Sequence, residues 1–147
     1  MQNTEENVRN QFLENLEKTL SDIELLESVP EYRVDSDRVD LLLKIRVGNT
    51  IKNLVCEIKS SGQPRYMFQA VSQVRLYSSF INNSYPIVVT PHIGEKSREI
   101  CKSFNVGYID LDGNVFLKFD EVLIEKESRK SRTRMRRQVK DLFAPLS

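Results

Sequence analysis

The sequence predicts a single α/β domain in which helices pack on a mixed sheet. Three observations support this: the chain opens with apolar residues at helical spacing, continues with a strictly alternating segment and a hairpin turn, and ends with short apolar runs that alternate with helical patterns. That order of elements is typical of a sheet covered by helices. A length of 147 residues suits one domain with a real core.

The first half of the chain is expected to form a helix and then a hairpin. Apolar residues at helical spacing predict an amphipathic helix, which the polar segment around Pro30 ends. Strict alternation then predicts a strand, and Gly48 with Asn49 supplies the turn to a returning strand. The expected bounds are about 4–27 for the helix, 38–47 for the first strand and 51–59 for the second.

The second half is expected to alternate helices with short strands. Asp112, Gly113 and Asn114 form a turn between two of them. A pattern starting at Asp110 superficially matches a calcium loop, but Val115 stands where that loop requires Gly, so a hairpin turn is the better interpretation. The expected elements are helices over about 65–81 and 94–104 and strands over 86–90, 107–111, 115–119 and 122–125.

Composition excludes several classes of protein. No apolar run approaches the roughly 20 residues of a membrane span, and the polar N-terminus is no signal peptide. Cys56 and Cys101 lack zinc-type spacing, so we expect a cytoplasmic protein with two reduced core cysteines and no membrane partner. His92, after an apolar run, is more typical of a capping or packing residue than of a ligand.

The hairpin register brings two acids together. Because the predicted turn pairs Val47 with Thr50, Asp40 lies opposite Glu57, and Lys59 projects from the same face. Two carboxylates on Cβ atoms about 4.5–5.5 Å apart repel each other unless a cation lies between them. The same register pairs apolar residues with one another: Val39 with Ile58, Leu41 with Cys56 and Leu43 with Leu54.

Such a group of side chains has a known chemical use. Mg²⁺ prefers oxygen ligands, typically one or two carboxylates with water and substrate phosphate. We expect Asp40 and Glu57 to bind Mg²⁺ or Mn²⁺, and the Lys59 ammonium to orient water or stabilise developing charge. The alternative is an ordinary acid pair on a solvated sheet face, neutralised by Lys59 and Arg38.

Asp40 followed by Glu57-Ile58-Lys59 resembles the D…(D/E)xK motif of the PD-(D/E)xK nuclease superfamily, which includes restriction endonucleases, Holliday-junction resolvases and RecB-type nucleases. Gln73 and Tyr77 resemble the Q-x-x-x-Y element of RecB-type members, and residues four apart share a helix face. The resemblance implies a restriction-endonuclease-like mixed sheet and a metal-dependent DNA hydrolase with Gln73 and Tyr77 in its catalytic site. Val39 departs from the usual Pro, which leaves metal binding intact.

Superfamily members often add an acid from the first helix. Glu14, Glu17 and Glu24 are the alternatives here, and Glu17 is preferred because it lies beside the apolar stripe of that helix. Arg65, near the start of the helix that follows SSGQP, either contacts a phosphate or lies in a segment that serves only as a turn.

The segments CEIKSSGQPRY, PIVVTPHIGEKSREICKSFNVGYIDLDGN and VFLKFDEVLIEKE resemble a little-characterised group of prokaryotic proteins. In that group a nuclease-like domain precedes a winged-helix DNA-binding region. The resemblance implies a nuclease-like domain over residues 1–125 and a basic segment, 126–147, that enters a winged helix. The sequence is then either a fragment or a naturally short version.

Charge is distributed unevenly along the chain. The net charge is +1, yet the segment from Ser128 to Lys140 holds seven basic residues and no acid, which leaves 15 bases against 21 acids elsewhere. This asymmetry indicates a polyanionic partner, expected to be DNA, although a solvated tail is the alternative. The tail residues expected to contact nucleic acid are Arg129, Lys130, Arg132, Arg134, Arg136, Arg137 and Lys140.

Two function classes therefore remain open. The set of Asp40, Glu57 and Lys59 favours a DNA-cleaving enzyme. The basic tail favours a catalytically silent module that binds nucleic acid or regulates through it. A homodimer is compatible with both.

Overall fold

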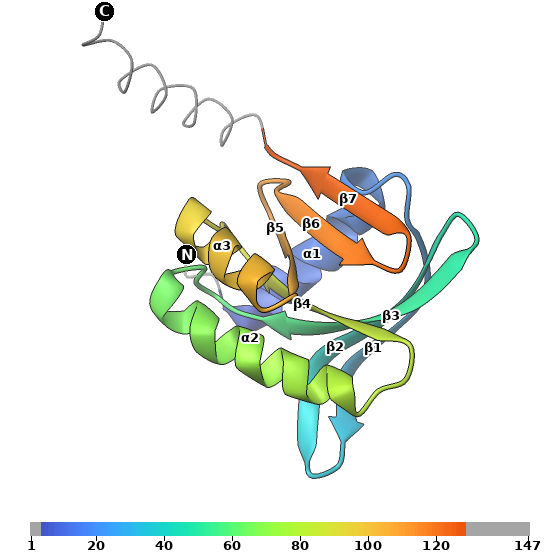
Figure 1. Ribbon diagram of the computed structural model, residues 1–147, viewed down its shortest axis with the longest axis horizontal. Coiled ribbons are helices and arrows are strands. Elements are labelled where there is room, and N and C mark those ends of the chain that lie inside the picture. The colour runs from blue at the N-terminus through green and yellow to red at the C-terminus, as the bar shows by residue number, and fades with distance from the viewer. Residues whose placement is uncertain (1–3, 129–147) are drawn as a thin grey trace, which may run out of the picture.

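The computed structural model describes residues 4–128 as a seven-stranded mixed sheet with helices on both faces (Figure 1). The strands lie in the sheet in their chain order, with β1 at one edge and β7 at the other. The elements are α1 (Glu5–Thr19), β1 (Glu24–Val34), β2 (Asp37–Val47), β3 (Thr50–Ile58), α2 (Pro64–Ser79), β4 (Ser84–Thr90), α3 (Glu95–Ser103), β5 (Gly107–Asp110), β6 (Val115–Phe119) and β7 (Val122–Lys126).

The direction of pairing changes twice across the sheet. Strands β1, β2 and β3 are antiparallel, β3, β4 and β5 are parallel, and β5, β6 and β7 are antiparallel again. Parallel neighbours need a crossover connection, and α2 and α3 provide it. The predicted mixed-sheet α/β architecture is confirmed.

Two apolar clusters hold the helices on the sheet. On one face, Leu16 of α1 belongs to an apolar cluster that also contains Leu43 and Ile87 of the sheet. On the other face, α2 and α3 pack through residues such as Val74 and Cys101 (Figure 1). Each large apolar side chain that is fully buried stabilises the fold by about 1.5–3 kcal/mol.

The predicted hairpin and its register are confirmed over most of its length. Val47 pairs with Thr50, and Leu41 pairs with Cys56. Gly48 has a φ of +59°, which is the left-handed conformation that a tight two-residue turn requires and that Gly adopts without steric cost.

The prediction of one long first helix is wrong. The helix ends at Thr19, and the segment assigned to its end and to the following break forms β1 instead. Leu20 and Ile23 are buried beyond the helix, which is why the apolar pattern seemed to continue. Pro30 lies inside β1, and an edge strand tolerates it because one side of that strand needs no partner.

The predicted alternation along β2 fails at one point. Val39 was expected to share a face with Leu41, but it packs in the cluster under α2 and α3 while Leu41 packs under α1. The β2–β3 register ends at the pair of Leu41 with Cys56, so neither of the next two predicted pairs, Asp40 with Glu57 and Val39 with Ile58, forms. The strands separate beside Asp40.

The two cysteines are buried with free thiols, as predicted. Burial raises the pKa of Cys101 to about 12, so the thiol is not a reactive thiolate at neutral pH. Within residues 4–128, no helix combines the length and apolar character that crossing a membrane requires.

Candidate active site

The candidate site begins where β2 and β3 separate. In an antiparallel ladder the hydrogen-bonded pairs recur every two residues, so the Ile58 N–H would next donate to the Val39 carbonyl. It donates instead to Asp40 Oδ2, at 2.8 Å. The Asp40 side chain thus replaces a backbone partner at the end of the ladder. Its other oxygen, Oδ1, accepts no hydrogen bond from the residues that the structure describes.

Glu57 lies beside this point, near the end of β3. It is 5% exposed and pairs with Val88 of β4 in the parallel part of the sheet. Burial and then the negative charge of Asp40 raise the pKa of Glu57 to about 7, and Glu5 adds a smaller upward effect. The two predicted metal ligands are therefore close enough to repel each other, although Asp40 and Glu57 do not form a ladder pair.

Lys59 follows Glu57 on the same face. Its Nζ lies 3.5 Å from Glu57 Oε2. This ammonium lowers the pKa of Glu57, but burial and Asp40 outweigh it. The Lys59 backbone N–H donates to the Val89 carbonyl at 2.9 Å, which extends the pairing of β3 with β4 beyond the end of the strand and fixes the base of the side chain.

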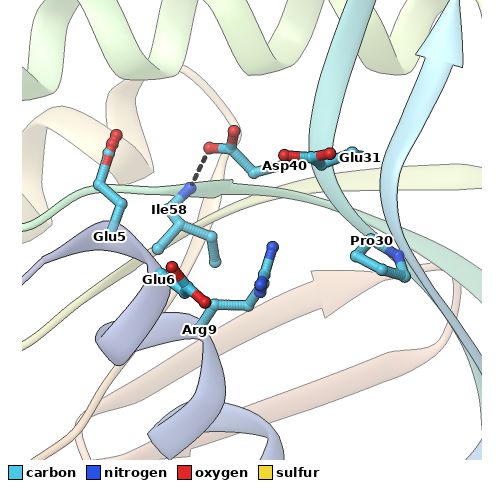
Figure 2. Close-up of a pocket in the computed structure, with 7 residues that line it drawn as sticks. All are labelled: Glu5, Glu6, Arg9, Pro30, Glu31, Asp40 and Ile58. Carbon is cyan, nitrogen blue, oxygen red and sulfur yellow. Dashed lines mark hydrogen bonds between the residues drawn. The ribbon is translucent and has the colours of Figure 1, made fainter.

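A cavity of about 370 Å³ opens on the side of Asp40 that faces α1. Asp40 and Ile58 line it from the strands, and Glu5, Glu6 and Arg9 line it from the first two turns of α1 (Figure 2). Pro30 and Glu31 of β1 complete the wall. Four acidic side chains and one basic side chain therefore line this cavity.

The backbone is strained at this wall. Glu31 has a φ of +50°, which is uncommon for a residue other than Gly. The β1–β2 register pairs Pro30 with Leu41 and Tyr32 with Val39, so Glu31 lies across from Asp40. Strain of this kind costs on the order of 1–3 kcal/mol and clusters at functional sites.

The structure favours Glu5 over the predicted Glu17 as the acid from the first helix. Glu17 is exposed and lies twelve residues after Glu5, which is roughly 18 Å along a helix. Glu14 is also exposed, and Glu24 belongs to β1, where it forms an ion pair with Arg46. Glu5, in contrast, lines the cavity and influences the pKa of Glu57.

Gln73 and Tyr77 bond to each other on α2. Gln73 Nε2 donates to Tyr77 Oη at 2.7 Å, and Tyr77 is 6% exposed within the apolar cluster under the helix. Among residues 4–128, the pair has no recorded hydrogen bond to Asp40, Glu57 or Lys59. The two side chains therefore orient each other, and their predicted role in the catalytic site stays a prediction.

Of the residues predicted to contact nucleic acid, Arg65 belongs to the described part of the chain. Arg65 is exposed at the start of α2, where its guanidinium lies 4.6 Å from the centre of the Tyr66 ring. The seven basic residues between Arg129 and Lys140, and the predicted entry to a winged helix, lie outside the described residues.

The loop after Lys59 is held tightly. A Cβ at Gly62 would lie 2.0 Å from the backbone oxygen of His92, so the close approach of these two segments requires Gly. Ser97 Oγ also donates to the Gly62 carbonyl. These contacts fix the segment that joins Lys59 to α2.

A second cluster of potential ligands proves structural. His92, Asp110 and Asp112 each place one ligand atom within 4.8 Å of the others. Both Asp110 oxygens already accept hydrogen bonds: Oδ1 from the amides of Asp112 and Asn114, and Oδ2 from Ile93 N and Asn114 Nδ2. Asp110 therefore holds the turn between β5 and β6, as the hairpin interpretation predicts, and is a poorer ligand than Asp40.

Two solved structures, one of a repair endonuclease and one of EndoMS, share much of this arrangement of elements. A repair endonuclease from Pyrococcus abyssi matches 75% of this chain and 47% of its own, with a TM-score of 0.52 and 16% identity. A complex of EndoMS with double-stranded DNA matches 74% of this chain and 44% of its own, with a TM-score of 0.51 and 17% identity. The chain shares its fold with these endonucleases.

The likeness is one of fold, because the identities are low. The chain spans less than half the length of either endonuclease chain. The sequence matches no protein-family model and has no significant match among curated proteins.

Proposed function

We propose that this protein is a metal-dependent phosphodiesterase that cleaves DNA, with residues 1–125 as its nuclease-like domain. The observation that carries the proposal is the pairing of two mutually repelling carboxylates, Asp40 and Glu57, beside the Lys59 ammonium at the end of β3. Support also comes from the fold shared with a repair endonuclease and with EndoMS bound to double-stranded DNA.

The donor set fits a hard divalent cation such as Mg²⁺ or Mn²⁺. Asp40 offers a free oxygen, and burial together with the charge of Asp40 raises the pKa of Glu57 despite the nearby Lys59, an effect that a bound cation would oppose. Two carboxylates, with water and substrate oxygens, are the usual protein ligands of Mg²⁺. When bound, the metal polarises a phosphoryl oxygen and makes a bound water more acidic.

The remaining roles belong to side chains near the two carboxylates. Lys59 is held at the site by its ion pair with Glu57 and can donate hydrogen bonds to a water molecule or to a phosphoryl oxygen on which charge develops. Gln73 assists from α2, with its side chain oriented by Tyr77. Glu5 is the acid from α1 that completes the site.

The test is cleavage of labelled DNA by purified protein with Mg²⁺ or Mn²⁺. We expect cleavage that EDTA abolishes and that Asp40→Asn abolishes without loss of DNA binding. Glu17→Gln, a change at an exposed position on α1, should leave the rate unchanged. Absence of cleavage by wild-type protein across single-stranded, duplex and branched substrates, with binding retained, would support the silent nucleic-acid-binding module instead.

A further inference from the structure

Arg9 is a half-buried cation in the acidic cavity. It lies in the second turn of α1, and its side chain extends from the helix toward the strands that carry Asp40 and Pro30 (Figure 2). Of the described residues that line this cavity, Arg9 is the one basic side chain. Three acids from two different elements, Glu5, Glu6 and Glu31, line the same space.

The guanidinium is nonetheless unpaired. Among residues 4–128 it forms no hydrogen bond, and no carboxylate oxygen lies within 4.0 Å of it. Unpaired basic side chains are ordinary at exposed positions, where water solvates them, but Arg9 is half-buried. Its five donors form a rigid fork that suits the oxygens of a phosphate.

The acidic lining of the cavity explains why a phosphate would need the Arg9 guanidinium. A DNA phosphate that approaches Asp40 meets the carboxylates of the cavity wall, and each of them repels it. Lys59 already forms an ion pair with Glu57. A cation that lines the cavity itself, as Arg9 does, would hold the phosphate against this repulsion.

We propose that Arg9 binds a phosphate oxygen of the DNA strand that enters the cavity beside Asp40. This inference rests on the proposed nuclease function and assigns it a substrate-binding residue on α1. The competing role for Arg9 is structural: its charge would offset the carboxylates around it and stabilise the empty cavity. The two roles differ in what salt does to DNA binding, because each phosphate contact contributes to the salt dependence.

The experiment measures binding of a short fluorescein-labelled DNA duplex over a series of salt concentrations. Every variant carries Asp40→Asn and is kept in EDTA, so no cleavage occurs, and the Asn side-chain oxygen can still accept the Ile58 amide. Arg9→Gln and Arg9→Lys are compared with Lys18→Gln, which removes an exposed charge from the last turn of the same helix. Thermal unfolding is recorded for each variant.

We expect Arg9→Gln to weaken binding about tenfold at low salt, as the loss of one charge-assisted hydrogen bond would. It should also make the log–log salt dependence shallower by about 0.9, the contribution of one phosphate. Arg9→Lys should keep the slope and recover part of the affinity, and Lys18→Gln should change neither.

An unchanged affinity and slope in Arg9→Gln would overturn the inference, and if the wild type cleaves DNA the proposed function would stand. A lower unfolding temperature with an unchanged slope would assign Arg9 the structural role and overturn the inference in the same way. A wild-type protein that neither binds nor cleaves DNA would overturn both.

Discussion

Lys59 and Glu57 form an ion pair at the end of β3, with Nζ 3.5 Å from Oε2, yet Glu57 does not keep the low pKa of a paired carboxylate. Burial and the neighbouring Asp40 raise its pKa to about 7. A pKa of about 7 means that Glu57 gains or loses its proton near neutral pH. This property has consequences for stability and for metal binding that can be measured separately.

Glu57 should make the metal-free protein less stable as pH rises. Its pKa in the folded state, about 7, lies above the ordinary value of 4.5, so the folded state holds the proton more tightly. The stabilising effect is fully present below pH 4.5 and is lost as pH rises through 7, with a total of about 3 kcal/mol.

The measurement is urea unfolding at pH 5 and pH 8. Glu57→Gln should abolish this part of the pH dependence and should be more stable than wild type at pH 8. Glu17→Gln, at an exposed position, is the control that should track the wild type. The prediction would be contradicted if the free energy of unfolding changed equally between pH 5 and pH 8 in wild type and in Glu57→Gln.

Binding of Mn²⁺ should tighten with pH over the same range. A carboxylate must lose its proton to bind metal, so below pH 7 the apparent affinity should rise about tenfold per pH unit and then level off above the pKa. Calorimetry at pH 6, 7 and 8 in two buffers of different ionisation enthalpy counts the protons released. Glu57→Gln should bind weakly at every pH; affinity that is the same at pH 6 and 8 would count against Glu57 as a ligand.

The sequence predicts the hairpin well because local chemistry determines it. A two-residue turn and apolar pairs such as Leu41 with Cys56 and Leu43 with Leu54 favour one register between β2 and β3. Strand β1 was not predicted because most of its residues are exposed, so it lacks the alternation that one buried face imposes. Pro30 within it also resembled a break between elements.

The site residues also fall into two groups: those that the sequence predicts from nearby segments, and those that only the packing of distant segments brings in. Asp40, Glu57 and Lys59 belong to one hairpin and its exit, so the local pairing of two consecutive strands is enough to bring them near one another. Glu5 and Arg9 reach the site only because the start of α1 packs beside the end of β3, and no sequence period encodes that contact. Their nearest sequence signal is that both lie on the polar side of the first helix.

Replacing Asp40 by Ala should destabilise the protein more than replacing it by Asn. Alanine leaves the partly buried Ile58 N–H without its partner, which costs about 1–3 kcal/mol, whereas the Asn oxygen can accept the same hydrogen bond. Both variants should lose cleavage. Urea unfolding separates them, and equal stability of the two would show that the Asp40–Ile58 bond does not matter to the fold.

Gly62→Ala should disturb the loop that follows Lys59. The added Cβ would lie 2.0 Å from the His92 oxygen, so one of the two backbones must move, at a cost of about 1–3 kcal/mol. Gly94→Ala is the matched control, since no atom lies within 4 Å of its added Cβ. We expect Gly62→Ala to lower both the unfolding midpoint and the cleavage rate. If Gly62→Ala and Gly94→Ala had equal effects, the close approach of the loop to His92 would not require Gly at position 62.

Removing residues 128–147 should weaken DNA binding without changing which sequence is preferred. The segment carries seven basic residues between Arg129 and Lys140, and phosphate contacts position a protein on DNA but do not specify sequence. If the tail engages about four to six phosphates, wild-type binding should show a log–log salt slope of roughly −4 to −5 from this segment, and the deletion should flatten it.

The deletion should leave the fold intact, because within residues 4–128 the two apolar clusters extend no further along the chain than Ile124. Unfolding by urea checks this before binding is compared. A graded series that replaces two, four and then all seven bases by Gln tests the charge itself, since each phosphate lost should reduce the slope by about 0.9. Unchanged affinity and slope in the truncated protein would mean that the tail makes no DNA contact, and its charge would then serve solubility or a protein partner.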